Sequence, residues 1–373
     1  MSLPQSEAII DLDAVRANTA RLAAGTSAQV MAVVKADGYG HGMVPAARAA
    51  LAGGATWLGA CTVPEALALR AAGITARVFA WLIAPGQPLD GAVGADIDLS
   101  ASTVAGLEEV AAAARTTGRT ARVHLKVDTG LGRNGSTVAD WPDLLAAAAK
   151  HAAEGTVDVV GVWSHFARAD EVGHPANARQ VAVFTEALDA ALQAGLRPEV
   201  RHLANSAAAL TMPAAHFDLV RPGIALYGLS PVPGDTFGLR PAMTLRASLV
   251  TAKRVPAGQG VSYGHAYTTE RETTLGLVPL GYADGIPRAA SGRGPILVGG
   301  RRRLIAGRVC MDQVVVDVGD DDVRAGDDAV LFGPGDDGEP TADDWAEVLD
   351  TINYEIVTRV GARVPRTYRG DST

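Results

Sequence analysis

The feature that most constrains the fold of this chain is a regular alternation of short apolar segments with longer Ala- and Leu-rich segments between residues 29 and 223. Short apolar runs bounded by turn residues are typical of buried parallel strands, and the segments between them have the periodicity of crossover helices. Strands are expected at residues 29–35, 56–62, 76–83, 95–100, 121–127, 157–165, 199–205 and 217–223. Eight such units over roughly 200 residues predict an α/β fold with a (β/α)8 barrel of the TIM type. A doubly wound open sheet is the competing topology.

After about residue 225 the pattern changes to apolar runs separated by Gly, Pro and Asp turns, which predicts a mainly-β region. Its strands are expected at residues 243–255, 273–283, 301–309, 312–319 and 328–333. One final helix is expected at residues 341–360, because Thr341 can cap it and acidic residues fill its first turn. The expected domains are a barrel at residues 13–232 and a C-terminal mainly-β domain at residues 233–373, which the N-terminal strand 7–12 is expected to join.

The composition is that of a globular protein, with 48% hydrophobic and 20% charged residues. A net charge of −8 disfavours a nucleic-acid partner, because phosphate binding needs clustered Lys and Arg. No apolar stretch approaches a membrane span, and the first residues lack the pattern of a signal peptide, so a cytoplasmic location is expected. The two cysteines, Cys61 and Cys310, are too few for a disulfide framework and lack the spacing of metal ligands, so no metal is expected.

Polar residues gather where the predicted strands end, which is the side on which a barrel builds its active site. They are Lys35, Lys126, Asp128, Ser164, His165, Asn205, Ser206 and Arg221. Each of them alone has an ordinary structural explanation, such as a snorkelling lysine or a hydrogen-bonded core histidine. Two lysines, a histidine and an arginine at one buried rim are nevertheless costly together unless an anionic ligand accompanies them.

The run RPGIALYG adds a candidate phosphate site, since it places the backbone N–H groups of Gly223 and Ile224 beside the eighth strand, where barrels often hold phosphate. A lysine at the same rim can form a Schiff base with an aldehyde. The two features together favour a phosphorylated aldehyde cofactor, pyridoxal 5'-phosphate, held by Lys35. From the residues alone, a phosphosugar enzyme or another Schiff-base barrel enzyme is the alternative.

Nine segments carry a resemblance that covers nearly the whole chain. In order they are VVKADGYGHG, HLKVDTGLGRNG, WSHFA, LANSAA, RPGIALYG, GVSYGHAYT, GYADGIPR, GRVCMDQ and NYEI. Together they resemble the alanine racemase family, whose members are pyridoxal-phosphate-dependent homodimers with an N-terminal barrel and a C-terminal β domain. The resemblance implies an isomerase that interconverts L-alanine and D-alanine and supplies D-alanine for peptidoglycan.

The resemblance also implies which residues act. Racemisation needs a base on each side of a planar intermediate; Lys35, which would hold the cofactor, is implied as one base, and Tyr263 from the partner subunit as the other. The implied cofactor contacts are Tyr39, His165, Asn205, Ser206, Arg221, Gly223, Ile224 and Tyr354. Arg133, Met311 and Asp312 are implied to bind the substrate, and Lys126 stands where many members carry a carbamylated lysine.

Alternatives within the same chemistry stay open at this point. A racemase of serine or of a basic amino acid is the nearest one, because a pocket discriminates by only ~1–3 kcal/mol per methylene. A related decarboxylase would place a catalytic cysteine in the second domain, whereas Cys310 stands beside the residue that resembles the carboxylate contact. A non-enzymatic carrier of the cofactor would lack the β domain that holds Tyr263. The glycines of VVKADGYGHG are expected to let the backbone approach the cofactor, and no role for His41 follows.

Overall fold

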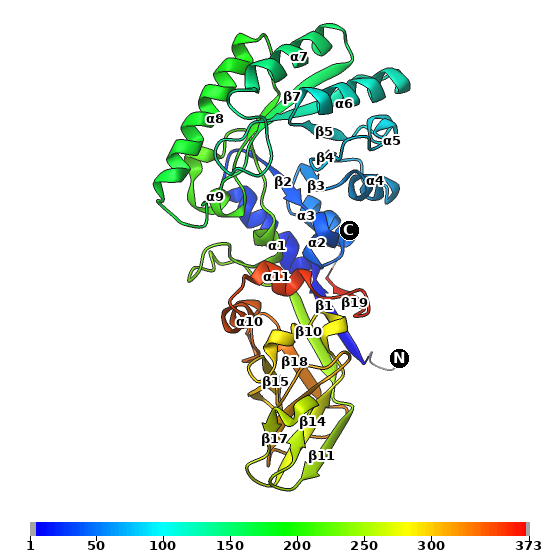
Figure 1. The fold of residues 1–373 in the computed structure, drawn as a ribbon, viewed down its shortest axis with the longest axis vertical. Helices are drawn as coiled ribbons and strands as arrows, with labels where there is room; N and C mark the ends of the chain where they lie inside the picture. Colours follow the sequence, from blue (N-terminus) through cyan, green and yellow to red (C-terminus); the bar gives the residue numbers. More distant parts are fainter. Residues whose placement is uncertain (1–4, 371–373) are drawn as a thin grey trace.

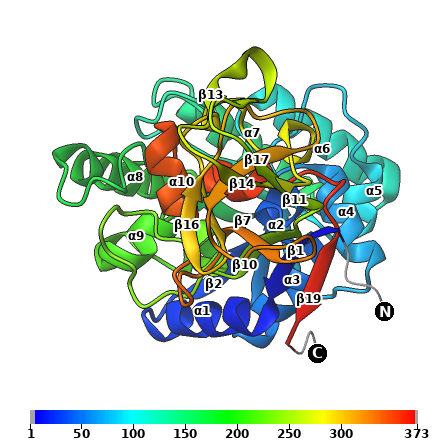
Figure 2. The same cartoon turned by 90° about the horizontal axis from the view of Figure 1, so that it is seen from below.

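The computed structural model describes residues 5–370; residues 1–4, where the N-terminal segment starts, and 371–373, where the expected second domain ends, lie outside the described residues. A helix-rich part and a strand-rich part follow one another along the long axis of the molecule (Figure 1). Seen along that axis from below, the strands of the second part lie over the middle of the ring of helices (Figure 2).

The first part is a ring of parallel strands, in the order β8-β7-β6-β5-β4-β3-β2-β9. The strands are β2 (Gln29–Val33), β3 (Trp57–Ala60), β4 (Arg77–Ala80), β5 (Asp98–Ala101), β6 (Ala121–Lys126), β7 (Val157–Trp163), β8 (Val200–His202) and β9 (Leu219–Val220). Two backbone hydrogen bonds close the ring between β8 and β9, from Asp218 N to Arg201 O and from Arg221 N to Ala204 O. The predicted barrel is confirmed. Most of its strands are shorter than expected, because the polar residues at their ends leave the sheet to form the rim.

Helices surround the ring, and the sequence sets where several of them begin and end. They are α1 (Leu12–Ala24), α2 (Lys35–Tyr39), α3 (Met43–Ala52), α4 (Val63–Ala71), α5 (Asp90–Gly94), α6 (Val104–Thr117), α7 (Trp141–Ala153), α8 (Pro175–Gln193) and α9 (Ser206–Thr211). Thr62 and Glu65 form a capping box at the start of α4. Thr103 caps α6, and Gly118 ends it in the left-handed conformation, as a glycine after a helix is expected to do.

The interior of the barrel combines apolar and polar side chains. Its apolar members are Met31, Trp57, Phe79, Trp163, Val200 and Leu219. Asp98, His124 and His202 are buried among them, and the ring of His124 lies 4.3 Å from that of Phe79. Buried polar groups of this kind must find hydrogen-bond partners. Asp98, His124 and His202 therefore have to find their hydrogen-bond partners within the barrel.

The second part is built on a six-stranded sheet in the order β16-β15-β18-β10-β1-β19, with a three-stranded sheet β11-β14-β17 and the pair β12-β13. The bounds are β1 (Ser6–Asp11), β10 (Met243–Ser248), β11 (Thr251–Val255), β12 (Gly260–Val261), β13 (Tyr267–Thr268), β14 (Thr273–Val278), β15 (Pro295–Val298), β16 (Arg301–Leu304), β17 (Val314–Gly319), β18 (Asp328–Phe332) and β19 (Arg366–Arg369). Strand β1 pairs antiparallel with β10 and parallel with β19. The first and last strands of the chain therefore lie side by side in this sheet.

Two expectations for this region are wrong. Residues 243–255 form two strands in different sheets, because the chain leaves β10 at Leu249, which pairs its backbone with Asp327 and Gly326 instead. The single helix expected at 341–360 is two helices, α10 (Ala342–Leu349) and α11 (Asn353–Thr358). Asp350 ends α10 in the left-handed conformation with a φ of 54°, where the helix cannot continue.

Among the described residues, no helix combines the length and the apolar character needed to cross a membrane.

Candidate active site

A cavity of about 750 Å³ opens at the carboxyl end of the barrel strands. It is lined by the predicted residues Lys35, Tyr39, Lys126, Arg133, His165, Asn205, Ser206, Arg221, Gly223, Ile224 and Tyr354. Tyr354 comes from α11 of the second part, and the other predicted residues come from the barrel. The structure therefore gathers in one cavity residues that are more than 300 positions apart in the sequence.

The cavity also has walls that sequence reasoning missed, namely Cys61, Trp81 and Trp163. Each of them lies at or just past the end of a barrel strand, which is the signal that could have found them. The Lys35 amine lies 5.8 Å from the centre of the Trp81 ring and 6.0 Å from that of Tyr39. Burial lowers the pKa of Lys35, and the nearby Arg133 lowers it further. A lowered pKa increases the fraction of neutral, nucleophilic amine.

The segment that follows Lys35 is a left-handed turn. Strand β2 ends at Val33, two residues earlier than expected, and Ala36, Asp37, Gly38 and Tyr39 have φ angles of 53°, 51°, 63° and 54°. Of these four residues only one is a glycine, so three side chains occupy a conformation that costs about 1–2 kcal/mol each. The turn therefore needs contacts that hold it.

The other two glycines of VVKADGYGHG lie against the second part of the molecule. A Cβ atom on Gly40 would lie 2.5 Å from the carbonyl oxygen of Val357 in α11, and one on Gly42 would overlap the hydroxyl of Tyr368 in β19. These glycines make room for the second part of the molecule. The expectation that they let the backbone approach a cofactor stays a prediction.

Arg221 is the buried cation at the centre of the rim. Its Nη2 donates to the carbonyl oxygens of Ser164 at 2.7 Å and Leu203 at 3.2 Å and lies 3.2 Å from Nδ1 of His165. Its Nη1 lies 3.0 Å from Nδ1 of His202. Burial lowers the pKa of Arg221 to about 9, which leaves the guanidinium charged at neutral pH. Arg221 therefore remains a charged hydrogen-bond donor whose contacts fix its position.

A ladder of side chains descends from Arg221 into the barrel. His202 Nε2 lies 2.8 Å from His124 Nδ1, and His124 Nε2 lies 3.2 Å from Oδ2 of Asp98. A guanidinium only donates and a carboxylate only accepts, so all three pairs are satisfied when both histidines are neutral and carry their proton on Nε2. We name Asp98, His124, His202 and Arg221 the polar ladder. Sequence reasoning missed its lower members, although both histidines lie in predicted strands.

The charges of the polar ladder follow from burial. Burial lowers the pKa of both His124 and His202. For Asp98 burial acts in the opposite sense, but the hydrogen bond from His124 and the hydrogen bond and positive charge of Arg122 hold the pKa of its carboxyl below the usual range. The ladder is therefore a chain of neutral imidazoles between a carboxylate and a guanidinium.

Hydroxyl and amide groups meet in one corner of the cavity. Ser206 Oγ accepts a hydrogen bond of 2.8 Å from the backbone N–H of Gly223. A Cβ atom on Gly223 would overlap the hydroxyl of Tyr39, so that hydroxyl reaches directly over the glycine backbone. Burial raises the pKa of Tyr39 and of Tyr354, which keeps both phenols protonated as donors. Neutral hydroxyl donors gathered beside the backbone of Gly223 fit a phosphate group.

Lys126 is buried beside this set. Its amine lies 4.1 Å from the centre of the Trp163 ring. Burial, with the charges of Arg221 and Arg133, lowers the pKa of Lys126 to about 8. Roughly a tenth of this amine is neutral at pH 7.

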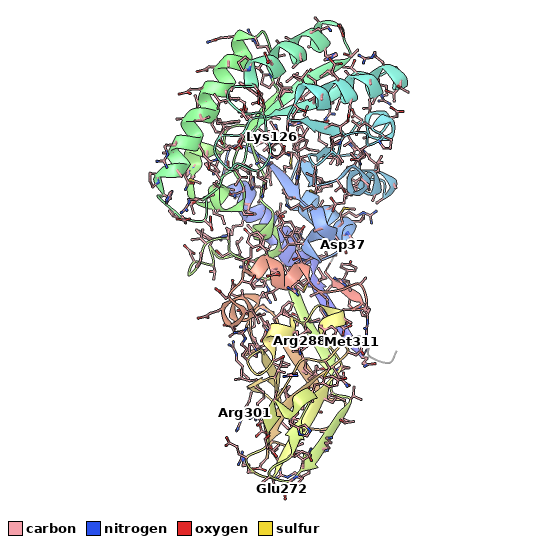
Figure 3. The ribbon with its side chains drawn as sticks, in the orientation of Figure 1. Asp37, Lys126, Glu272, Arg288, Arg301 and Met311 are labelled. Carbon is pink, nitrogen blue, oxygen red and sulfur yellow. The ribbon has the colours of Figure 1, made fainter. Side chains whose placement is uncertain are left out.

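Three predicted residues are not brought to the cavity of their own chain, namely Tyr263, Met311 and Asp312. Tyr263 is 70% exposed and Met311 is 53% exposed. Figure 3 shows Met311 in the strand-rich part and Lys126 in the barrel. Asp312 is also exposed and pairs with Arg363 at 2.7 Å. All three residues are therefore exposed and lie outside the lining of the cavity.

Two family models match the chain. That of the alanine racemase N-terminal domain matches residues 10–231, and that of the alanine racemase C-terminal domain matches residues 242–368. The chain belongs to the alanine racemase family. The alanine racemase of Salinispora arenicola is 66% identical over 368 residues, which are 98% of this chain and 99% of that protein.

Solved structures of the alanine racemase family agree with this assignment. The alanine racemase from D-cycloserine-producing Streptomyces lavendulae is 59% identical and superimposes with a TM-score of 0.98, over 100% of this chain and 98% of that one. The alanine racemase from Bacillus anthracis, solved with bound L-Ala-P, is 35% identical with a TM-score of 0.89, over 100% of this chain and 97% of that one. The resemblance found in the sequence is confirmed.

The polar ladder predicts how stability depends on pH. A buried histidine whose pKa is lowered by folding binds fewer protons than it does in the unfolded chain, so acidification below about pH 6.5 favours unfolding by up to about 1.4 kcal/mol per pH unit and histidine. The variant His202→Gln keeps a donor and an acceptor but does not titrate. Urea unfolding between pH 7.5 and 5.5 should therefore show a shallower loss of the free energy of unfolding for His202→Gln than for the wild type.

Asn177→Ala provides the control for this measurement, because it changes a buried side chain that does not titrate. It should lower the free energy of unfolding without changing the slope of that free energy against pH. A wild-type slope equal to that of His202→Gln would contradict the neutral state of the ladder.

Proposed function

We propose that this chain interconverts L-alanine and D-alanine with pyridoxal 5'-phosphate as cofactor, in the cytoplasm, and so supplies D-alanine for peptidoglycan. The observation that carries the proposal is the meeting, in one cavity, of a half-buried lysine of lowered pKa, a phosphate-fitting corner and a fixed guanidinium. Membership of the alanine racemase family supports the reaction, and bound L-Ala-P in the Bacillus anthracis relative supports a small ligand of this kind.

The residues present fit the cofactor. Lys35 would hold its aldehyde carbon, and the phosphate would lie in the corner formed by Tyr39, Ser206, Gly223, Ile224 and Tyr354. Arg221 would face the ring nitrogen, with His165 and Asn205 beside the ring. When bound, the cofactor supplies a conjugated electron-withdrawing system that makes the Cα proton of an attached amino acid acidic.

The remaining steps belong to the protein. Lys35 is placed to remove or return the Cα proton on one face, because its amine is the group that the substrate amine displaces. Tyr263 serves the opposite face, and Met311 and Asp312 bind the substrate carboxylate. Within one chain these three residues are exposed and outside the cavity. We therefore propose a head-to-tail homodimer in which the domain at 233–373 of one subunit completes the cavity in the barrel of the other.

Lys126 and Arg133 complete the proposed substrate site. With its pKa lowered to about 8, the Lys126 amine has a neutral fraction able to add to carbon dioxide, releasing a proton and leaving a carbamate. This exchange replaces a positive charge by a negative one near the guanidinium groups of Arg133 and Arg221, which relieves the repulsion among the three cations. The carbamate would orient Arg133 toward the cofactor and the substrate carboxylate.

The shared site can be tested by mixing two inactive variants. Lys35→Ala and Tyr263→Phe should each be inactive as homodimers. After subunit exchange about half of the dimers are mixed and carry one complete site of two, so about a quarter of wild-type activity should return. Racemisation of each alanine enantiomer, followed by polarimetry, measures the recovery.

Mixing Lys35→Ala with the double variant Lys35→Ala, Tyr263→Phe is the matched control, and it should return nothing. Mixed dimers of the two single variants that form and stay inactive would contradict the shared site.

The identity of the cofactor lysine can be tested because two lysines, Lys35 and Lys126, line the same cavity. The holoenzyme should show a visible absorption band that borohydride abolishes, and peptide mapping should then find the cofactor on Lys35. Lys126→Ala should keep the band and Lys35→Ala should lose it. A label found on Lys126 would overturn the assignment.

A further inference from the structure

His41, the histidine of VVKADGYGHG, does not line the cavity and is fully buried behind it. Its Nδ1 lies 3.1 Å from the carbonyl oxygen of Gly38 and 3.0 Å from that of Tyr39. Both oxygens can only accept, so Nδ1 carries the proton and donates to the two carbonyls. Among the described residues, Nε2 of His41 has no hydrogen-bond partner. Within residues 5–370, the His41 ring therefore forms hydrogen bonds only with the left-handed turn.

Donation to these carbonyls supports a turn whose backbone conformation is unfavourable. The ends of the turn have other partners: Ala36 N donates to Glu65 Oε1 at 2.8 Å, and Met43 N donates to Asp37 Oδ1 at 2.8 Å. Its last two carbonyls, those of Gly38 and Tyr39, receive their side-chain donor from His41. Because three non-glycine residues in this turn oppose their preferred backbone conformation, a donor that holds its carbonyls stabilises the turn.

A second aromatic residue ties His41 to the strand before the turn. The His41 ring stacks on Tyr227 with centroids 4.4 Å apart and an angle of 27°. The hydroxyl of Tyr227 donates to the carbonyl of Val33, the last residue of β2, at 3.2 Å. Tyr227 also lies 5.1 Å from the ring of Tyr39. The pair His41–Tyr227 thus contacts the chain on both sides of Lys35.

The second part of the molecule closes the same turn from outside. Arg366 of β19 donates from Nε to the carbonyl of Gly40 at 3.1 Å, and Val357 of α11 lies against Gly40. The turn is therefore enclosed between the His41–Tyr227 pair and the second part. A movement of the turn away from either would shift the Lys35 amine and the Tyr39 hydroxyl together.

We propose that His41 is a positioning residue: with Tyr227 it holds the left-handed turn that places the Lys35 amine and the Tyr39 hydroxyl in the cavity. This inference rests on the proposed function, since its readout is the binding of pyridoxal 5'-phosphate. His41 acts on the cofactor only through the backbone of the turn.

The test compares three variants by equilibrium binding of pyridoxal 5'-phosphate to the dimer freed of cofactor. His41→Phe keeps an aromatic ring but removes the donor, and it should weaken binding by about tenfold. His41→Asn restores a donor and should recover most of that loss. His151→Phe replaces a buried histidine on the outer helix α7 and should bind like the wild type at equal or lower thermal stability.

The outcomes separate the two proposals. A wild type that does not bind pyridoxal 5'-phosphate would overturn the proposed function together with this role. A wild type that binds, with His41→Phe binding equally well or His151→Phe losing as much, would overturn the role of His41 alone.

If His41→Phe does not fold, Tyr227→Phe carries the test, because it removes only the hydroxyl that holds Val33. It should weaken binding by about threefold to tenfold, and unchanged binding would overturn the pairing.

Discussion

The burial of the Arg221 guanidinium inside the barrel is the constraint on which the rest of the site depends. A buried cation is stable only when its donors are satisfied, and the carbonyls of Ser164 and Leu203 accept from one of its nitrogens. His202 must then accept from the other, which sends its own proton toward His124 and that of His124 toward Asp98. The hydrogen-bond pattern in the middle of the barrel is therefore set from the rim downward.

A second constraint lies at the seam between the two parts. The turn after Lys35 is held by residues of the barrel and of the second part, and α11, which carries Tyr354 into the cavity wall, also supplies the carbonyl of Val357 that excludes a side chain at Gly40. The cavity and the seam thus share one helix. Strand β1 leads directly into α1 of the barrel, and it pairs with β10 and with β19, the strand that follows α11. This pairing ties α11 to the barrel. The position of Tyr354 in the cavity wall therefore depends on the pairing of the first and last strands of the chain.

Sequence reasoning could predict whatever depends on local pattern. The barrel strands followed from apolar runs, and the rim residues followed from their place at the strand ends. The left-handed turn could not be predicted, because Ala36 and Tyr39 are not residues that favour it and distant contacts hold it. The end of α10 at Asp350 could not be predicted, because the sequence has helical periodicity on both sides of this residue. The polar ladder was missed because its members are 26 and 78 residues apart, and only barrel closure makes them neighbours.

The placement of the exposed residues completes the chemical argument. The cavity holds cations at Lys35, Lys126, Arg133 and Arg221, which suits an anionic ligand. A racemase must also approach Cα from the side opposite its lysine, and the candidate for that task, Tyr263, is 70% exposed on the second part of the same chain. Tyr263 does not line the cavity of its own barrel, whereas in the proposed dimer a second copy docked head to tail would present it there. In the proposed dimer, the same contact would bury Met311 and supply the missing base, so assembly and catalysis would depend on one interface.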